Sequence, residues 1–137
     1  MQSNLQISQL SIVKLLDRQA KRLLSNEPDP DSYTYKVKDL VITQLRKRKL
    51  GIEVVADDLS MSVRSLQMKL KEEGTSYQKL LNRIREQLAI AFLQEKKYSK
   101  SEIADLLGFS EISVFSRTFK KWTGQSPSEF QLTLSAF

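Results

Sequence analysis

The residues best suited to bind another molecule lie in the stretch Gly108–Gly124, which reads GFSEISVFSRTFKKWTG. Phe115, Phe119 and Trp122 recur at positions i, i+4 and i+7, so on a helix they point toward one side and into a core. Hydroxyl, guanidinium and ammonium donors then fall on the other faces, and such donors contact phosphates and the acceptor-rich edges of bases. An ordinary amphipathic surface helix would have the same two faces. The outward donors are Ser113, Ser116, Arg117, Lys120 and Lys121.

Composition limits the chemistry and the partners. The chain has 137 residues, with 22 Lys and Arg against 16 Asp and Glu, and its net charge of +6 favours a polyanionic partner. It contains no Cys and no His, which excludes disulfides, thiolate or imidazole metal sites and Cys or His catalysis. No apolar run approaches the ~18 residues of a membrane span, and the N-terminus lacks the order of a signal peptide. We therefore expect a soluble, cytoplasmic protein with no membrane partner.

The first segment has the pattern of an amphipathic helix and a linker. Between Leu5 and Leu24, apolar residues recur at three- and four-residue steps and charged residues fill the gaps. The segment Ser25–Ser32, SNEPDPDS, contains two prolines and ends this helix. Residues 1–32 are thus either a docking helix for the next domain or the tail of a missing sensor domain. The apolar stripe comprises Leu10, Val13, Leu16, Ala20 and Leu23.

A second helical pattern begins at Lys36, with Val37 and Val41 on its apolar face. Its end, Arg46–Gly51, reads RKRKLG, an order that suits the negative end of the helix dipole and a left-handed stop at the glycine. The basic run has two interpretations, a solvated helix end or a contact with a phosphate backbone.

The segment Val54–Ser76, VVADDLSMSVRSLQMKLKEEGTS, predicts two short helices joined by a tight turn. The second helix buries Val63, Leu66 and Leu70, and polar residues face outward from it. This arrangement is the helix-turn-helix pattern. The outward positions are Arg64, Gln67, Met68 and Lys71.

The same unit occurs again about fifty residues later. A chance repeat of turn, cap, core and C-terminal glycine is improbable, so the duplication is the strongest structural signal in the chain. The matched pairs are Ala56 with Ala104, Leu59 with Leu107, Met61 with Phe109, Ser62 with Ser110, Leu66 with Phe115, Leu70 with Phe119, Gly74 with Gly124, and Ser76 with Ser126.

Between the two units, Ser76–Glu95 predicts one uninterrupted helix of about 30 Å. Successive major-groove faces on one side of B-DNA lie about 34 Å apart. This helix is therefore the right length to hold two recognition helices in adjacent major grooves. A plain central core helix fits the same residues, and both interpretations can hold.

Two capping boxes bound the later helices. Ser99 with Glu102 starts the first helix of the second unit, and Ser126 with Glu129 starts a short final helix that has Pro127 at its first position. These serines cap helices, and no general base lies at a useful spacing from them. We therefore expect neither an enzyme nor a cofactor or metal site.

The stretches Ile103–Ser110, Phe115–Gly124 and Ser126–Phe130 resemble the C-terminal DNA-binding domain of the AraC/XylS family of bacterial transcription regulators. Ala56–Leu70 and Arg85–Phe92 resemble the matching first half, so the resemblance covers about residues 36–130. It implies an activator that binds double-stranded DNA and recruits RNA polymerase. Family members usually carry a sensor or dimerisation domain upstream, so a homodimer would form through regions outside the DNA-binding domain.

The resemblance and the patterns together predict an all-α fold with two homeodomain-like helix-turn-helix subdomains of the AraC type, joined by a long linker helix. An extra N-terminal helix precedes them. The predicted DNA-binding domain is 33–137, with helix-turn-helix units at about 52–73 and 100–123, a linker helix at about 76–96 and a final helix at about 127–134.

Carrying the family's contacts over by position assigns base-reading candidates to both units. Arg117 is the best single candidate because arginine can grip guanine O6 and N7, and Gln67 could do the same with adenine N6 and N7. Lys71, Lys120 and Lys121 are expected on phosphates. The base-reading candidates are Arg64, Gln67, Met68, Ile112, Ser113, Val114, Ser116 and Arg117.

Some positions depart from the family's pattern. Met68 stands where many members have arginine, and Ile112 and Val114 stand where polar readers are common. Apolar side chains can read thymine methyl groups, so we expect a T-containing half-site. Ile112 and Val63 fit a core position equally well. Gln131 replaces the family's arginine after the last motif, which leaves a phosphate contact there open.

The sequence thus predicts a sequence-specific, double-stranded DNA-binding transcription regulator. The alternative is a protein-interaction or dimerisation module of a regulator that does not itself bind DNA specifically. The moderate charge and the acidic residues Glu72, Glu73 and Glu111 near the recognition helices favour this alternative.

Overall fold

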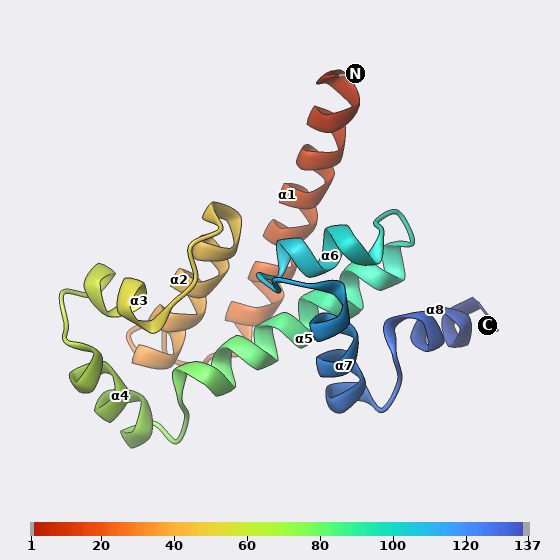
Figure 1. The fold of residues 1–137 in the computed structure, drawn as a ribbon. Coiled ribbons are helices and arrows are strands. Elements are labelled where there is room, and N and C mark those ends of the chain that lie inside the picture. Colours follow the sequence, from red (N-terminus) through yellow and green to blue (C-terminus); the bar gives the residue numbers. More distant parts are fainter. Residues whose placement is uncertain (1, 136–137) are drawn as a thin grey trace. The chain divides into compact units, whose positions relative to one another are not determined.

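The chain folds into helices joined by short turns (Figure 1). The structure, a computed structural model, describes the backbone of residues 2–135 and the side chains of residues 11–134. Within that range it contains no strand, and the predicted all-α fold with a duplicated helix-turn-helix and an extra N-terminal helix is confirmed. The helices are α1 (Gln2–Ser25), α2 (Tyr33–Lys47), α3 (Ile52–Asp58), α4 (Val63–Glu72), α5 (Tyr77–Glu95), α6 (Lys100–Leu106), α7 (Ile112–Thr123) and α8 (Pro127–Ser135).

These helices form two compact units, and the boundary falls within α5. The first unit ends at Ile84 and the second begins at Arg85. The first helix-turn-helix, α3 and α4, therefore belongs to the first unit, and the second, α6 and α7, to the second.

In the first unit, α2 packs against α1, α3 and α4. Leu15, Leu16 and Leu23 of α1 are buried. Val13, which the apolar stripe predicted to be buried, is 40% exposed, and the side chain of Leu10 lies outside the described residues. The side chains of α2, α3 and α4 that are at most 1% exposed are Val37, Val41, Leu45, Val55, Leu66 and Leu70.

Two ion pairs join the start of this unit to α2. Lys38 is buried and its ammonium group pairs with the carboxylate of Glu27, in the linker before α2. Arg46, near the end of α2, pairs with Asp17 of α1. The linker and α1 are therefore bound to the helix that supports the first helix-turn-helix.

Helix α2 differs from its prediction at both ends. It begins at Tyr33 rather than Lys36, because the Ser32 hydroxyl accepts a 3.0 Å hydrogen bond from the backbone N–H of Tyr35. The predicted stop at Gly51 is wrong. Arg48 takes the left-handed conformation instead, with φ 58°, and the Lys49 N–H closes the helix by donating to the Gln44 carbonyl at 3.0 Å.

The second unit is built around two aromatic side chains of α7. Phe115 and Phe119 are fully buried, with ring centroids 5.9 Å apart. The Phe119 ring also meets the Phe130 ring of α8 edge-on at 5.5 Å. The predicted capping box at Ser99 is present, because its hydroxyl accepts from the Glu102 N–H and the Glu102 carboxylate accepts from the Ser99 N–H, both at 3.0 Å.

Candidate nucleic-acid interface

Helix α4 has one buried and one exposed face. The Ser62 hydroxyl starts the helix by accepting a 3.1 Å hydrogen bond from the backbone N–H of Ser65. Leu66 and Leu70 are fully buried, and α4 packs on α2 and α3 through this side. Val63, for which core and reading positions were both open, is half-buried.

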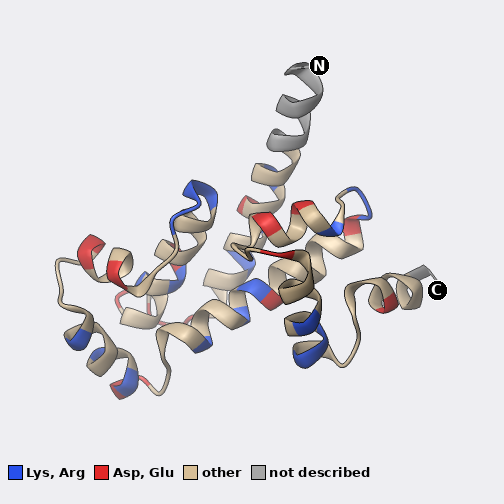
Figure 2. Ribbon diagram, in the orientation of Figure 1, with Lys and Arg blue, Asp and Glu red and all other residues tan. Residues whose placement is uncertain are grey.

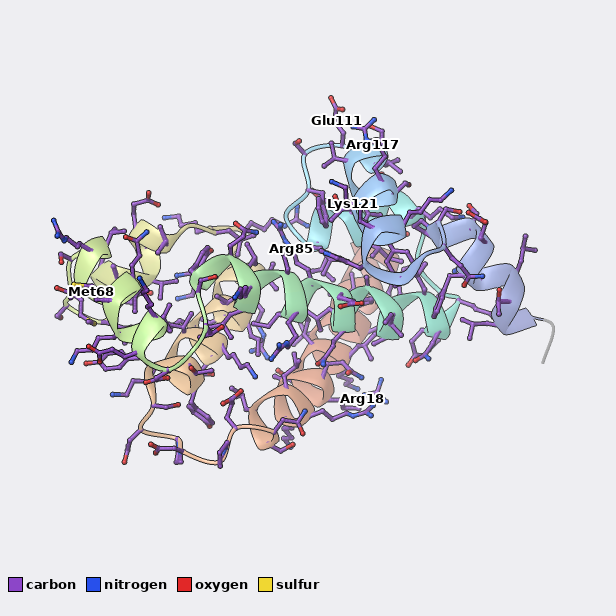
Figure 3. The ribbon with its side chains drawn as sticks, turned by 90° about the horizontal axis from the view of Figure 1, so that it is seen from below. Arg18, Met68, Arg85, Glu111, Arg117 and Lys121 are labelled. Atoms are coloured by element: carbon purple, nitrogen blue, oxygen red, sulfur yellow. The ribbon has the colours of Figure 1, made fainter. Side chains whose placement is uncertain are left out.

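The four predicted site residues of α4 all lie on its exposed face. Arg64, Gln67 and Lys71 have no hydrogen-bond or ion-pair partner for their side chains within the described part of the chain. Met68 is 56% exposed, and Figure 3 shows it projecting outward from α4. A large exposed thioether beside unpaired donors can pack on an apolar group of a ligand while the donors bind its polar atoms.

Helix α7 repeats this arrangement in the second unit. It follows a turn that contains Gly108 and ends at Gly124, whose φ of 84° lies in the left-handed region that glycine adopts most readily. Glu111 precedes the helix and accepts a 3.3 Å hydrogen bond from the Ser113 hydroxyl. Trp122, predicted to point into the core, is half-buried, with its ring 6.3 Å from that of Phe109.

The predicted site residues of α7 fall into two groups. Ser113, Arg117, Lys120 and Lys121 are exposed, whereas Val114 and Ser116 are half-buried at the edge of the core. The structure also places Ile112 outside the core, at 45% exposure. Of the three cations, only Lys120 has an ion-pair partner among the described residues.

Arg117 and Lys121 point away from the core of the second unit (Figure 3), and no side chain in the described part of the chain pairs with either of them. Lys120 lies 4.0 Å from the carboxylate of Glu129. Both members of this pair are well exposed, so the pair costs little to break. Lys120 can therefore exchange Glu129 for another anion.

Charge is distributed in the same way in both units (Figure 2). The first helix of each helix-turn-helix carries acidic side chains, Asp57 and Asp58 on α3 and Glu102 and Asp105 on α6. The second helix carries three cations in each unit, although Glu72 is acidic on α4 and Lys100 is basic at the start of α6. An anionic partner is therefore attracted to α4 and α7 and repelled by α3 and α6. The cations of the second helices are Arg64, Lys69 and Lys71 on α4, and Arg117, Lys120 and Lys121 on α7.

Glu73, which follows α4, anchors the end of that helix to the start of α2. Its carboxylate accepts hydrogen bonds from the backbone N–H groups of Tyr33 at 2.9 Å and Thr34 at 2.8 Å, and from the Thr34 hydroxyl. Partial burial acts to raise the pKa of Glu73, but these hydrogen bonds and the charge of Lys36 outweigh burial and lower the pKa below its ordinary value. The carboxylate is thus a cap for α2, and it is occupied rather than available to a partner.

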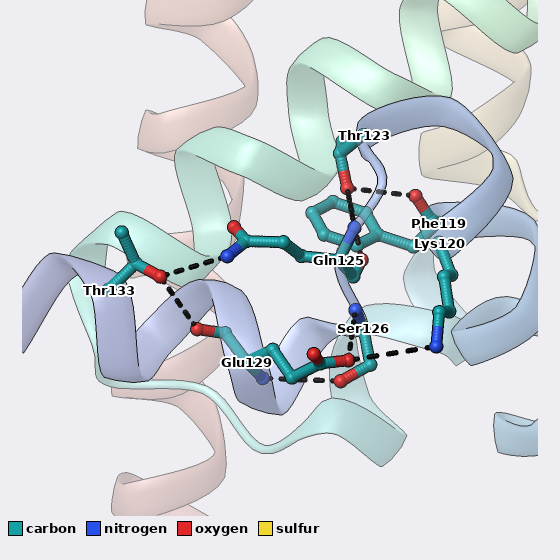
Figure 4. Close-up of polar contacts among 7 residues, drawn as sticks. All are labelled: Phe119, Lys120, Thr123, Gln125, Ser126, Glu129 and Thr133. Atoms are coloured by element: carbon teal, nitrogen blue, oxygen red, sulfur yellow. Dashed lines mark hydrogen bonds and ion pairs between the residues drawn. The ribbon is translucent and has the colours of Figure 1, made fainter.

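A polar network fixes α8 against the end of α7 (Figure 4). The Glu129 carboxylate accepts from the Ser126 N–H at 3.1 Å, and the Ser126 hydroxyl accepts from the Glu129 N–H at 3.2 Å, which is the predicted capping box. The pKa of Glu129 lies below its ordinary value. The hydrogen bond from the Ser126 backbone is the largest cause, followed by the Ser126 hydroxyl and the positive charge of Lys120. Gln131 stands where the family has arginine. Its side-chain amide donates a 3.3 Å hydrogen bond to the Leu93 carbonyl of α5.

The sequence indicated neither the role of Glu73 as a cap of α2 nor the contact of Arg85 with the turn before α7. Arg85 is half-buried on α5 and its side chain contacts the turn before α7. One signal was available, because Arg85 lies four residues from both Leu81 and Ala89 and therefore on the apolar face of the predicted helix. Glu73 carries no comparable signal, since it lies in a run of charged residues.

Within the described part of the chain, no group of acidic side chains is placed to hold a metal ion. None of the helices of residues 2–135 has both the length and the apolar character that crossing a membrane requires.

Comparison with known proteins gives consistent matches. A family model described as a helix-turn-helix domain matches residues 55–133. The ornithine utilization regulator of Pseudomonas aeruginosa is 34% identical over 126 residues, which cover 87% of this chain and 35% of that protein. The DNA-binding dual transcriptional regulator Rns of Escherichia coli is 31% identical over 98 residues, which cover 72% of this chain and 37% of that protein. The chain thus spans about a third of the length of these curated relatives.

Solved structures match as well. A DNA-binding transcriptional dual regulator from Escherichia coli aligns with a TM-score of 0.73 at 27% identity, over 82% of this chain and 99% of that one. The C-terminal domain of AraT, a response regulator from Geobacillus stearothermophilus, aligns with a TM-score of 0.67 at 29% identity, over 74% of this chain and 84% of that one.

Proposed function

This chain belongs to the AraC/XylS family of helix-turn-helix transcription regulators, and on that premise we propose that it reads two short DNA motifs through α4 and α7. Membership supports DNA-binding transcription regulation in general, and it supports a function other than enzymatic catalysis.

The observation that carries the proposal is the shared design of α4 and α7. Each helix buries two large side chains on one face, and each presents cations and other exposed side chains on the opposite face. Arginine and glutamine on such a helix can bind base edges, and lysines at its margins can bind phosphates. We assign base reading to Arg64, Gln67, Met68, Ser113, Val114, Ser116 and Arg117, and phosphate binding to Lys71, Lys120 and Lys121.

The length of α5 supports two motifs about one helical turn apart. Its 19 residues make a helix of about 28 Å, close to the spacing of about 34 Å between major-groove faces on one side of B-DNA. We propose that α4 and α7 enter adjacent major grooves, and that residues 33–137 act as the DNA-binding domain. We also propose that the protein activates transcription through RNA polymerase, is located in the cytoplasm and dimerises through regions outside this domain.

The test is selection of bound sequences from a random pool of double-stranded DNA. We expect enrichment of two short motifs about one helical turn apart, at least one of them containing thymine, because Met68 and Val114 can contact its methyl group. Affinity for the selected site should then be measured at several salt concentrations. The three phosphate-binding lysines predict a log-log slope of about −2.7, at about −0.9 for each contact.

A pool without enrichment would contradict the proposal. Weak binding that depends on salt but not on sequence would reduce the function to electrostatic attraction. Binding that is absent at low salt would favour the alternative, a protein-interaction module, for which exposed Glu111 at the start of α7 is the supporting feature.

A further inference from the structure

We propose that Arg85 is a positioning residue, which holds the turn before α7 and thereby sets where the base-reading side chains of α7 lie. The inference rests on the DNA-binding function proposed above. It concerns a residue of α5 that is not on either recognition helix.

The guanidinium group of Arg85 binds the backbone where α6 ends. Its Nε donates to the Leu107 carbonyl at 2.8 Å, and a terminal nitrogen donates to the Gly108 carbonyl at 3.4 Å. Carbonyl groups at the end of a helix lack partners within the helix. Arg85 therefore satisfies two groups of the turn and fixes their position relative to α5.

The same guanidinium group also lies over an aromatic ring. Its central carbon is 4.5 Å from the centroid of the Phe109 ring, which is within the range of a cation–π contact. The Phe109 ring is in turn 5.5 Å from Phe115 and 6.3 Å from Trp122, both on α7. A continuous path of contacts thus runs from α5 through Arg85 and Phe109 to the recognition helix.

This arrangement requires arginine in particular. A planar guanidinium can donate along two directions in its plane while its face lies on a ring. Lysine has a single ammonium group, which can make one of these contacts but cannot reproduce the set. Figure 3 shows Arg85 projecting from α5 toward the turn, whereas the reading residue Arg117 projects outward from α7. Arg85 thus acts on DNA through α7.

Loss of the Arg85 contacts should affect only the DNA motif that α7 reads. The turn leads directly into α7, so a shift of its backbone moves Ser113 and Arg117 as a group. Hydrogen bonds to base edges need correct distance and direction, and they weaken steeply when the angle changes. Loss of Arg85 should therefore reduce discrimination at the motif read by α7 and leave the motif read by α4 unchanged.

The first experiment needs no DNA. Amide hydrogen exchange is measured for Phe109, whose N–H binds the Ala104 carbonyl at 2.9 Å, and for Met61, whose N–H binds the Ala56 carbonyl at 2.9 Å in the equivalent turn of the first unit. In Arg85→Met we expect exchange at Phe109 to become about tenfold faster while Met61 stays unchanged, because both hydrogen bonds from the guanidinium to the turn are lost locally. Arg83→Met, an exposed arginine on the same helix, is the matched control and should change neither amide.

The second experiment measures discrimination, defined as the ratio of affinities for an intact and a base-substituted motif. The α7 motif is the one at which Arg117→Ala loses a base preference. For Arg85→Met we expect discrimination there to fall about tenfold, with less than about a twofold change at the α4 motif. Arg85→Lys should give an intermediate loss at the α7 motif, and it serves as the folded variant if Arg85→Met does not fold.

Several outcomes would overturn the inference. Unchanged exchange at Phe109 in a folded variant would show that Arg85 does not hold the turn. Faster exchange with intact discrimination would show that the turn does not position α7. An equal loss on all DNA sequences would make Arg85 a phosphate contact. If the wild-type chain selects no motif, the proposed function fails, and unchanged exchange would still refute the role of Arg85 by itself.

Discussion

Replacing Arg117 by alanine should remove one base preference without weakening the fold. The side chain is exposed and has no partner within the described part of the chain, so the free energy of unfolding should change by less than about 0.5 kcal/mol. On DNA, a guanidinium that donates to guanine O6 and N7 contributes about 1–3 kcal/mol to discrimination. The affinity for the preferred site should therefore fall about 5- to 150-fold.

The assay is equilibrium binding to the selected site and to its three variants at the affected base pair. Lys121→Ala is the matched control, because Lys121 is an exposed and unpaired cation on the same helix. It should weaken binding to all four sequences equally and make the salt slope shallower by about 0.9. The reasoning fails if Arg117→Ala behaves like this control, since Arg117 would then bind a phosphate.

Three further predictions concern the elements that support the interface. Glu73→Gln should lower the unfolding free energy at pH 7 by about 0.5–1 kcal/mol by weakening the cap of α2. The folded state lowers the pKa of Glu73, so the contribution of this carboxylate to stability is present at neutral pH and is lost as the pH falls. In thermal melts, the variant should therefore lose less stability than the wild type on acidification. Equal losses would argue against the cap. Gln44→Met should raise the urea midpoint, with a gain of about 1 kcal/mol, because the amide is buried and bonds no described residue; a lower midpoint would contradict this. Ser99→Ala should cost about 1 kcal/mol in the same assay through loss of the capping box, whereas Ser101→Ala, at an exposed serine of the same helix, should cost nothing measurable.

Local patterns predicted much of this fold because they act over a few residues. The spacing of Phe115 and Phe119 depends only on helical periodicity, and both side chains are fully buried as expected. Ser99 and Ser126 were identified as caps because a capping box needs only a glutamate three residues later. The exposed positions of Arg64 and Arg117 follow from the same periodicity, while their contacts with DNA stay a prediction.

Contacts between distant parts of the chain were not predictable in the same way. Glu73 binds the N-terminus of α2, 39 and 40 residues away, and nothing in its neighbourhood indicates that helix. Arg85 binds a carbonyl 22 residues away. The predicted end of α2 was also wrong, because the left-handed conformation that the pattern assigned to Gly51 is adopted by Arg48. In each case the partner is set by packing, which periodicity does not describe.

The buried pair of Lys38 and Glu27 has a consequence for how the chain can be divided. The side chain of Lys38 is only 4% exposed, so replacing Glu27 by alanine would leave a buried ammonium group without its counterion. Removing one member of a buried pair costs about 3–5 kcal/mol, out of the 5–15 kcal/mol that typically separates folded from unfolded domains. The linker is therefore thermodynamically part of the first helix-turn-helix unit.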